Sequence, residues 1–360
     1  MSANNCEVLV IGEGLSGMMA AAAAASHGLR VMLVSKGPGN FVLGSTCIDL
    51  EGLSATKLGL ADNELTEAVD IFISLTASAD SAYNGGLHQR RTVPTILGTF
   101  QEVSLAPRSL WQADPRNVSK VLIVGFDRLS AFSANFLAER LSFHSHEMGL
   151  KTSYRSEIIP LLHSPRHAVT ALEIANHIDQ DEGYRTTLAN ALRPVIRDAE
   201  LVIIPAVLGV KSNETDLVCF EEDIGCAVCE LATLPPSVPG LRLLQRLEQR
   251  LTDLGVEIST GFAVRKLCTD GNRCVAVELD TPGRARRLTA DNVVLACGKF
   301  AEFLEPAAEA SIQYSALTNV SVCGSLLAQA DPRHRNAISL LSGYHAGMLA
   351  SEQGVQYAGR

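Results

Sequence analysis

The chain opens on an apolar strand that runs straight into a glycine-rich turn and then into a helix of small residues. Residues 8–17 read VLVIGEGLSG, and residues 18–25 are dominated by alanine. In a βαβ unit of this G-x-G-x-x-G type, the first glycine permits the sharp turn, the second lets backbone approach a pyrophosphate, and the third lets the helix pack closely on the sheet. The sequence therefore predicts a dinucleotide-binding turn, whose contacts are Gly12, Gly14, Leu15, Ser16 and Gly17.

The residues after this helix complete the unit but lack one expected side chain. Gly28 suits the position just past a helix C-terminus, and residues 29–34 form an apolar second strand. NAD-dependent sites usually place Asp or Glu at the end of this strand to bind the ribose hydroxyls, whereas this chain has Ser35 and Lys36. The missing acid argues against an NAD-dependent dehydrogenase. Ser35 remains able to bond a ribose, and Lys36 is either a phosphate contact or a solvated strand end.

Length and charge narrow the class further. At 360 residues the chain exceeds the size at which single cores stop growing, so we expect two interleaved lobes. A formal net charge of −9 argues against nucleic acid as a partner. Because apolar runs stay short of membrane-spanning length and residues 1–5 carry no signal-peptide pattern, we expect a cytoplasmic protein.

Cysteine and histidine spacing predicts neither a metal site nor thiol chemistry. The nine cysteines lie mostly in apolar segments and are expected to be buried, reduced thiols. Cys226 and Cys229 form a C-x-x-C pair, but no second pair completes a four-ligand site, and their strand-like surroundings differ from the helix start of a redox dithiol. His144 and His146, two positions apart, leave different faces of a helix and are expected to be surface residues.

The C-terminal third is predicted to return to the nucleotide-binding lobe. We expect a helix ending at Gly255, strands at 256–258, 263–268, 274–279, 286–289, 292–298 and 319–325, and a helix over 337–350. A strand, a small meander and a strand ending in Ala-x-Gly are typical of two-dinucleotide flavoproteins, in which the glycine lets backbone pass close to the cofactor. Ala296, Gly298 and Gly324 are therefore candidate cofactor contacts. Gly343 and Gly347, one turn apart, are expected to permit close helix packing.

The middle of the chain is predicted to form an inserted lobe. Strands are expected at 120–125 and 201–205, and helices at 131–148, 170–179 and 186–197. The predicted fold is α/β, a two-dinucleotide-binding-type (Rossmann-like) flavoprotein fold with a three-layer ββα core and an inserted α/β lobe. The expected organisation is a first part of the flavin-binding domain over 1–115, the inserted lobe over 116–235 and the return segment over 236–360.

Several stretches together resemble one family, the B subunit of anaerobic glycerol-3-phosphate dehydrogenase. They are residues 8–37, 121–125, 199–209 and above all 233–243, which read TLPPSVPGLRL. The Leu-Pro-Pro-Ser-Val motif is the specific part, since many flavoproteins share the glycine-rich turn. The resemblance extends from about residue 8 to residue 297 and resumes near residue 319.

The resemblance implies a flavin-bearing subunit that works with a larger flavoprotein A subunit and a membrane-associated iron–sulfur C subunit. Together such subunits oxidise sn-glycerol 3-phosphate to dihydroxyacetone phosphate and pass electrons to the quinone pool. The family is described as using FMN, whereas the pyrophosphate turn favours FAD, so the flavin stays open between the two.

Two departures from the family fall where the isoalloxazine ring is expected. Residues 299–318 alone bridge the Ala-x-Gly strand and the final strand, a shorter segment than the family has. The stretch before the last helix, glycine-rich in the family, is here DPRHRN at residues 331–336. The sequence therefore supports nucleotide binding better than chemistry at the flavin ring.

A catalytic constellation does not emerge from the residues. Oxidation of a secondary alcohol needs a base near the hydroxyl and cations for the phosphate. His334, between Arg333 and Arg335, is the nearest cluster, with a solvated loop as the competing interpretation. We expect the isolated chain to be inactive on glycerol 3-phosphate.

Gly44, Ser45 and Thr46 either place hydroxyls near the flavin or the cofactor phosphates, or cap the next segment. Two other functions remain open at this point. One is an independent flavin oxidoreductase of the fumarate reductase or succinate dehydrogenase type, which the shortened cap disfavours. The other is a non-catalytic, nucleotide-binding scaffold subunit.

Overall fold

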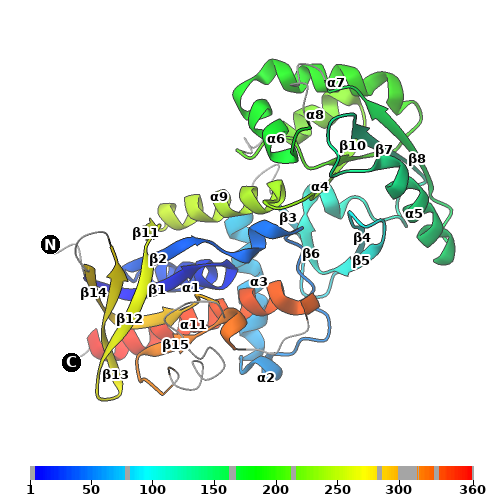
Figure 1. The fold of residues 1–360 in the computed structure, drawn as a ribbon. Coiled ribbons are helices and arrows are strands. Elements are labelled where there is room, and N and C mark those ends of the chain that lie inside the picture. Colours follow the sequence, from blue (N-terminus) through cyan, green and yellow to red (C-terminus); the bar gives the residue numbers. More distant parts are fainter. Residues whose placement is uncertain are drawn as a thin grey trace. The chain divides into compact units, whose positions relative to one another are not determined.

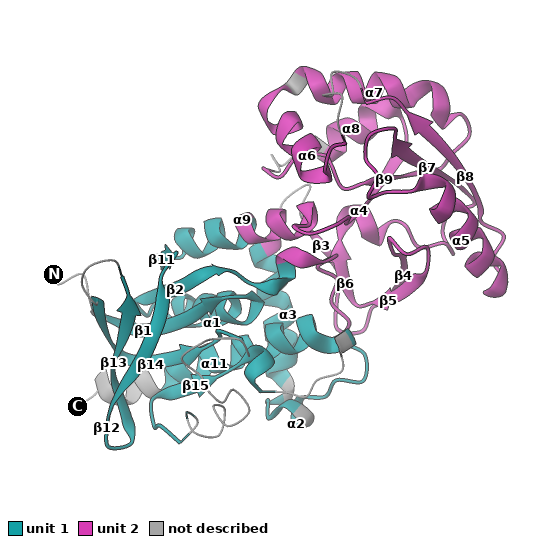
Figure 2. Ribbon diagram, in the orientation of Figure 1, with its two compact units in different colours: residues 1–41, 50–75, 246–360 teal, residues 42–49, 76–245 magenta. Residues whose placement is uncertain are grey.

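The chain divides into two compact units (Figures 1 and 2). The computed structural model describes residues 5–77, 82–161, 168–211, 216–281, 286–298, 314, 316–327 and 332–358. Unit 1 consists of residues 1–41, 50–75 and 246–360, and unit 2 of residues 42–49 and 76–245. These divisions differ from those expected near residues 116 and 236. The reason is that Val93, Val103 and Leu110 pack into the hydrophobic core of unit 2.

Unit 1 is built on a parallel sheet in the order β11-β2-β1-β14-β15. Its strands are β1 (Asn5–Glu13), β2 (Val31–Pro38), β11 (Glu257–Thr260), β14 (Arg286–Leu295) and β15 (Val320–Val322). The sequence predicted two strands where β14 is one. β14 is continuous because residues 286–288 pair antiparallel with residues 277–279, and residues 289–295 pair parallel with β1.

Three layers form around this sheet (Figure 1). An antiparallel hairpin of β12 (Ala263–Asp270) and β13 (Arg273–Asp280) joins β14. Leu9 of β1 and Val277 of β13 belong to one hydrophobic cluster, so one face of the sheet is covered by the meander. Since successive strand residues point to opposite faces, Val8 and Val10 face the other layer. The helices α1 (Leu15–Ser26) and α11 (Arg335–Ala358) pack against each other there, which confirms the predicted ββα core.

Polar contacts tie a third helix of unit 1 to α11. This helix is α3 (Asp62–Thr76). His345 Nδ1 lies 2.8 Å from Glu64 Oε1, and the Tyr344 hydroxyl donates to Glu67 Oε2 at 2.9 Å. The leucine-patterned helix α9 (Val238–Asp253) begins in unit 2 and ends in unit 1, where Gly255 follows it with φ at +82°, as expected.

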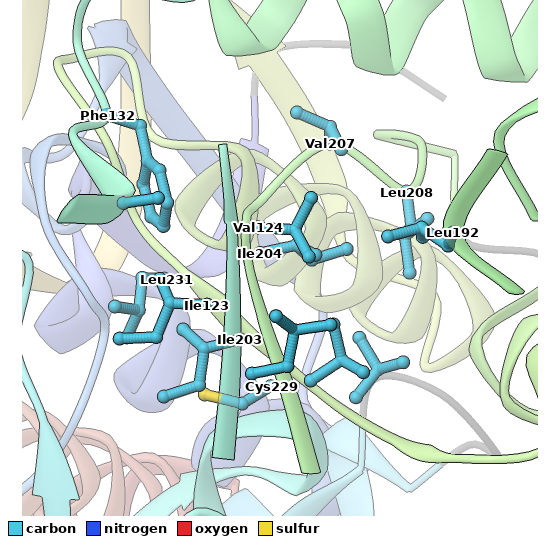
Figure 3. Packing of buried hydrophobic residues seen from close by; sticks show 14 of the residues in the cluster. Ile123, Val124, Phe132, Leu192, Ile203, Ile204, Val207, Leu208, Cys229 and Leu231 are labelled. Carbon is cyan, nitrogen blue, oxygen red and sulfur yellow. The ribbon is translucent and has the colours of Figure 1, made fainter. Parts of the chain in front are cut away.

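Unit 2 contains a four-stranded parallel sheet in the order β10-β9-β7-β8. Its strands are β7 (Lys120–Phe126), β8 (Ser153–Ile159), β9 (Leu201–Pro205) and β10 (Ala227–Leu231), and its helices are α5 (Ala134–Glu147), α6 (Ala171–Gln180), α7 (Glu182–Ile196) and α8 (Asp216–Ile224). Figure 3 shows Ile123 and Val124 of β7 packed with Ile203 and Ile204 of β9. Both central strands are apolar on both faces, as buried parallel strands require, and the inserted α/β lobe is confirmed.

Short elements complete the described chain. They are η1 (Asn40–Leu43), α2 (Ala55–Leu58), β3 (Tyr83–Gly85), β4 (Arg91–Pro94), β5 (Phe100–Val103), β6 (Leu105–Pro107), α4 (Arg108–Trp111), η2 (Gly324–Leu326) and η3 (Pro332–His334). β3 pairs with β6, and β4 pairs with β5.

Candidate nucleotide-binding site

The glycine-rich turn connects β1 to α1 and is held against the end of β14. Gly12 has φ of +115°, a conformation that L side chains rarely adopt. A Cβ atom on Gly12 would lie 2.4 Å from the carbonyl oxygen of Ala296, and the Ala296 amide donates to Ile11 O at 2.8 Å. The first glycine and the Ala-x-Gly strand, predicted as parts of one site, therefore meet backbone to backbone.

Tight packing surrounds the first turn of α1. A Cβ on Gly17 would lie 1.8 Å from Gly12 O, and a Cβ on Gly343 would lie 2.2 Å from Ser16 O. A Cβ on Gly324 would lie 2.5 Å from the Ser16 hydroxyl, which is itself buried. Gly347 likewise packs on Ala20, so the predicted packing role of Gly343 and Gly347 in α11 is confirmed.

Gly14 differs from these glycines because the space beside it is open. It is the N-cap of α1, with φ of −81° and ψ of 172°, and no side chain caps the helix. The nearest heavy atom to a Cβ built on Gly14 is Gly39 Cα at 4.0 Å. The first turn of α1 carries no acidic residue. An uncapped helix N-terminus beside an open glycine fits a phosphate group, because backbone N–H groups and the helix dipole favour an anion there.

The end of β2 carries a hydrogen bond that the sequence did not predict. The Ser35 hydroxyl donates to Glu13 Oε2 at 2.6 Å, and both side chains are buried. Thr260 of β11 also donates to Glu13 Oε2, at 3.0 Å. Ser35 therefore directs its proton to Glu13 in this structure, while Lys36 is exposed. Sequence reasoning missed the buried position of Glu13 beside the turn, although a charged residue between the first two glycines was a visible signal.

A second carboxyl group adjoins Glu13. Glu248 lies on α9 and is half-buried. Burial, followed by the neighbouring side chain and negative charge of Glu13, raises the pKa of Glu248 to about 7. Glu248 therefore keeps its proton to a higher pH than an ordinary glutamate does.

Gly44, Ser45 and Thr46 belong to unit 2. Thr46 is buried with φ of +61°, a strained conformation for a β-branched residue. The Tyr83 hydroxyl donates to Thr46 Oγ1 at 2.6 Å, and Thr46 Oγ1 donates to Ser45 O at 2.6 Å. The Thr46 hydroxyl is thus engaged within unit 2, and Gly44, Ser45 and Thr46 all remain candidate cofactor residues. Their contact with a cofactor stays a prediction.

The remaining candidates lie on the C-terminal strands and before α11. Gly298, at +74°, and Gly324, at +70°, have the positive φ angles that favour glycine. The Gly324 amide donates to the Ser342 hydroxyl at 2.9 Å. His334 ends the short helix η3, immediately before α11, and stays a weak catalytic candidate. Most of the shortened bridge over 299–318 lies outside the described residues.

Five of the nine cysteines are buried, and the other four are partly exposed. All nine are free of disulfides, and burial raises the pKa of Cys226 to about 11 and also raises that of Cys229. Within the described ranges, no group of three or more His, Cys, Asp or Glu side chains could hold a metal ion. His144 bonds Glu147 of its own helix through Nδ1 at 3.0 Å.

Comparison with known proteins defines the class to which this site belongs. A family model for an FAD-binding domain matches residues 7–54 and 236–331, which include the glycine-rich turn and the Ala-x-Gly strand. This match supports a flavin as the cofactor, and the open approach to Gly14 fits the pyrophosphate of FAD.

The similar proteins carry more specific names than the family model does. The probable B subunit of anaerobic glycerol-3-phosphate dehydrogenase from Halobacterium salinarum (strain R1) is 28% identical over 322 residues, covering 81% of this chain and 74% of that protein. The B subunits of anaerobic glycerol-3-phosphate dehydrogenase from Actinobacillus succinogenes and Actinobacillus pleuropneumoniae are 27% and 24% identical, each over 82% of this chain and 75% of the relative. The chain is homologous to these proteins, as the sequence motifs predicted.

A solved structure, L-amino acid deaminase from Proteus myxofaciens in complex with anthranilate, aligns over 82% of this chain and 46% of its own, at 15% identity and a TM-score of 0.33. Among the helices of the described chain, none is both long and apolar enough to cross a membrane.

Proposed function

We propose that the chain is the flavin-binding B subunit of a quinone-linked glycerol-3-phosphate dehydrogenase. The observation that carries this proposal is the 24–28% identity to proteins of that name over about four-fifths of the chain, together with the FAD-binding match at the glycine-rich turn. In this role the protein takes part in oxidising sn-glycerol 3-phosphate to dihydroxyacetone phosphate, and the two electrons released pass to the quinone pool.

The chain's own residues are proposed to bind and orient the flavin. Gly12 and Gly17 shape the turn, and the N-terminus of α1 at Gly14 receives the diphosphate. Gly298 and Gly324 bring backbone to the same end of the sheet, where β14 and β15 end. The flavin, when bound, supplies a two-electron acceptor.

We further propose that turnover requires an A subunit, and that a C subunit links the complex to the membrane, so that this chain stays on the cytoplasmic side. The relatives are named as subunits, which supports the existence of partners.

An assay of the purified chain tests the proposal. We expect flavin absorption bands at one flavin per chain, but no reduction of an artificial electron acceptor by glycerol 3-phosphate until the A subunit is added. A stable complex buries on the order of 1,600 Å² or more, so the mixture should co-elute in size-exclusion chromatography. Turnover by the chain alone, abolished in a His334→Ala variant, would show instead that this protein is catalytic in its own right.

A further inference from the structure

The sheet of unit 2 ends at β8, whose outer edge is open (Figure 1). β8 pairs with β7 on one side, and in the described part of the chain no strand pairs with its other side. The Ser153 amide donates to Ser119 O at 2.8 Å, and Ile159 O accepts the Asp127 amide at 3.1 Å, so the odd-numbered residues of β8 bond to β7. Because backbone groups alternate along a strand, the even-numbered residues direct their N–H and C=O groups outward. These residues are Tyr154, Ser156 and Ile158.

One face of β8 carries an exposed apolar side chain at this edge. The Ser145 hydroxyl of α5 donates to the Tyr154 hydroxyl at 3.2 Å, and the Ser156 hydroxyl donates to Asn135 Oδ1 of α5 at 2.9 Å. Because alternate side chains share a face, Ile158 lies on the same face as Tyr154 and Ser156. The Ile158 residue is 56% exposed. An open strand edge with an exposed aliphatic side chain is a template for pairing with another strand.

The opposite face of β8 carries one charge of each sign. Arg155 Nη2 donates to the carbonyl oxygens of Val195 and Ile196 at the end of α7, which holds the guanidinium in place. Glu157 lies two residues along, with Oε1 3.9 Å from Arg155 Nη1, too far for a hydrogen bond. Both charged side chains are partly exposed. They therefore present a positive and a negative group next to each other at the open edge.

Charge complementarity selects one register for pairing this edge with the same edge of a second copy. In an antiparallel pair, outward-pointing residues must face each other, so that they exchange N–H···O bonds. The register that places Ser156 opposite Ser156 of the second copy also places Arg155 opposite Glu157. It places Tyr154 opposite Ile158, an aromatic–aliphatic pair. The neighbouring permitted registers place either Arg155 opposite Arg155 or Glu157 opposite Glu157. Facing opposite charges stabilise a strand pair and facing like charges destabilise it, so the first register is favoured.

We propose that two copies of this chain pair through the outer edges of β8, antiparallel and with Ser156 on the two-fold axis, so that the two sheets continue into each other. The axis is perpendicular to the sheets, so both copies of α5 lie on the same face. A stable interface buries about 1,200 Å² or more, which exceeds a single strand pair, and the exposed Phe136 and Phe143 of α5 provide further apolar surface. Pro160 follows β8 and has no N–H, so the ladder ends there. The dimer goes beyond the proposed function, because its formation requires neither flavin nor another subunit.

Sedimentation equilibrium of the purified full-length chain over a range of concentrations tests this dimer. Glu157→Arg places like charges opposite each other at both ends of the strand pair and should raise the dimer dissociation constant about tenfold or more. Arg155→Glu should do the same. A mixture of these two variants restores opposite charges at both positions, so it should form a heterodimer under conditions in which each variant alone is monomeric. Glu222→Arg makes the same charge change at an exposed residue of α8, which packs near the other edge strand, β10, and should leave the dissociation constant unchanged.

A second pair of variants applies if Arg155→Glu, which loses the hydrogen bonds to α7, does not fold. Ser156→Pro removes an outward N–H group, which edge strands tolerate, and should give a monomer, whereas Ser156→Ala keeps that group and should stay dimeric. A wild-type chain that is monomeric at every concentration, or a dimer that survives Ser156→Pro, would overturn the proposal. A monomeric wild-type chain that binds the A subunit, with binding abolished by Ser156→Pro, would assign the edge to that subunit instead. The masses are measured with and without FAD, so a monomer that binds FAD refutes the dimer but not the proposed function.

Discussion

Replacing Gly14 by alanine separates a cofactor contact from a packing requirement. The backbone of Gly14 has φ of −81° and ψ of 172°, which any residue adopts without strain. A Cβ there has its nearest heavy-atom neighbour at 4.0 Å, so the folded chain has room for the methyl group. Gly17 is the matched comparison, because its Cβ would lie 1.8 Å from Gly12 O.

The stability change expected for Gly14→Ala is small. Alanine is a poorer N-cap than glycine by about 0.5–1 kcal/mol. Against this, alanine lowers the entropy of the unfolded chain and stabilises by about 0.4–1 kcal/mol. The two effects nearly cancel, so the unfolding free energy should stay within about 0.5 kcal/mol of wild type. Gly17→Ala forces backbone to move and should cost about 3 kcal/mol or more.

In contrast to its small effect on stability, Gly14→Ala should weaken flavin binding strongly. A methyl group on Gly14 occupies the space through which the diphosphate approaches the backbone amides of α1. Loss of one charge-assisted hydrogen bond costs about 2 kcal/mol, which raises the dissociation constant for the flavin about thirtyfold. Gly14→Val, with a larger side chain, should lose flavin entirely.

Two measurements on each variant distinguish a cofactor contact from a packing requirement. Chemical denaturation of the flavin-free chain gives the unfolding free energy, and fluorescence quenching on titration with FAD gives the dissociation constant. A Gly14→Val chain that folds and retains one flavin per chain would refute the assignment of this turn as the phosphate site. Gly14→Ala that unfolds as readily as Gly17→Ala would show that the open space beside Gly14 is needed for packing rather than for ligand.

Three further outcomes follow from the contacts. The double variant Cys226→Ala, Cys229→Ala should keep its flavin content and partner binding, because burial raises the pKa of both thiols. Loss of a bound metal or of electron transfer in this variant would contradict the prediction. Arg242→Met should destabilise unit 2 by about 3 kcal/mol in denaturant titration, since it leaves the buried Glu230 carboxylate without its cation, and adding Glu230→Leu should restore part of the loss. The free energy of unfolding should fall as pH rises from about 4.5 to about 7, because folding raises the pKa of Glu248 and the folded chain keeps a proton that the unfolded chain releases. The loss is about 1–2 kcal/mol after allowance for the partial exposure of Glu248. Melting curves of Glu248→Gln should not show this loss.

The core of the fold could be predicted from sequence because its signals are local. Continuous apolar runs at residues 8–11 and 201–204 predict buried parallel strands, and the glycines of the turn are fixed by backbone conformation at Gly12 and by close contact at Gly17. The division into units was less predictable. Residues 83–107 form short two-stranded pieces without a strong periodic pattern, and their membership of unit 2 depends on long-range packing of Val93 and Val103.

The role of Glu13 could not be predicted for a similar reason. Its neighbours Ser35, Glu248 and Thr260 are 22 to 247 positions away in the chain. The spacing of these residues in the sequence therefore does not predict that they lie together. The sequence showed only that the acid expected after the second strand was missing. The structure shows that a carboxyl group nevertheless lies 2.6 Å from the serine at that position, supplied by the first strand. It is buried and accepts hydrogen bonds from Ser35 and Thr260, so it is not an exposed ribose ligand.

The Leu-Pro-Pro-Ser-Val motif, which carried the resemblance most specifically, contains a serine that binds neighbouring backbone groups. The Ser237 amide donates to Val42 O at 2.7 Å, and its hydroxyl donates to Gly44 O at 2.5 Å. The same hydroxyl accepts the Gly240 amide at 3.0 Å at the start of α9, and Ser237 is fully buried. Two of these three contacts use the hydroxyl, and the buried space favours a small residue that carries one. The motif therefore holds the segment that leads to Thr46 in its strained conformation, and it does so without placing any of its own side-chain polar atoms toward a ligand.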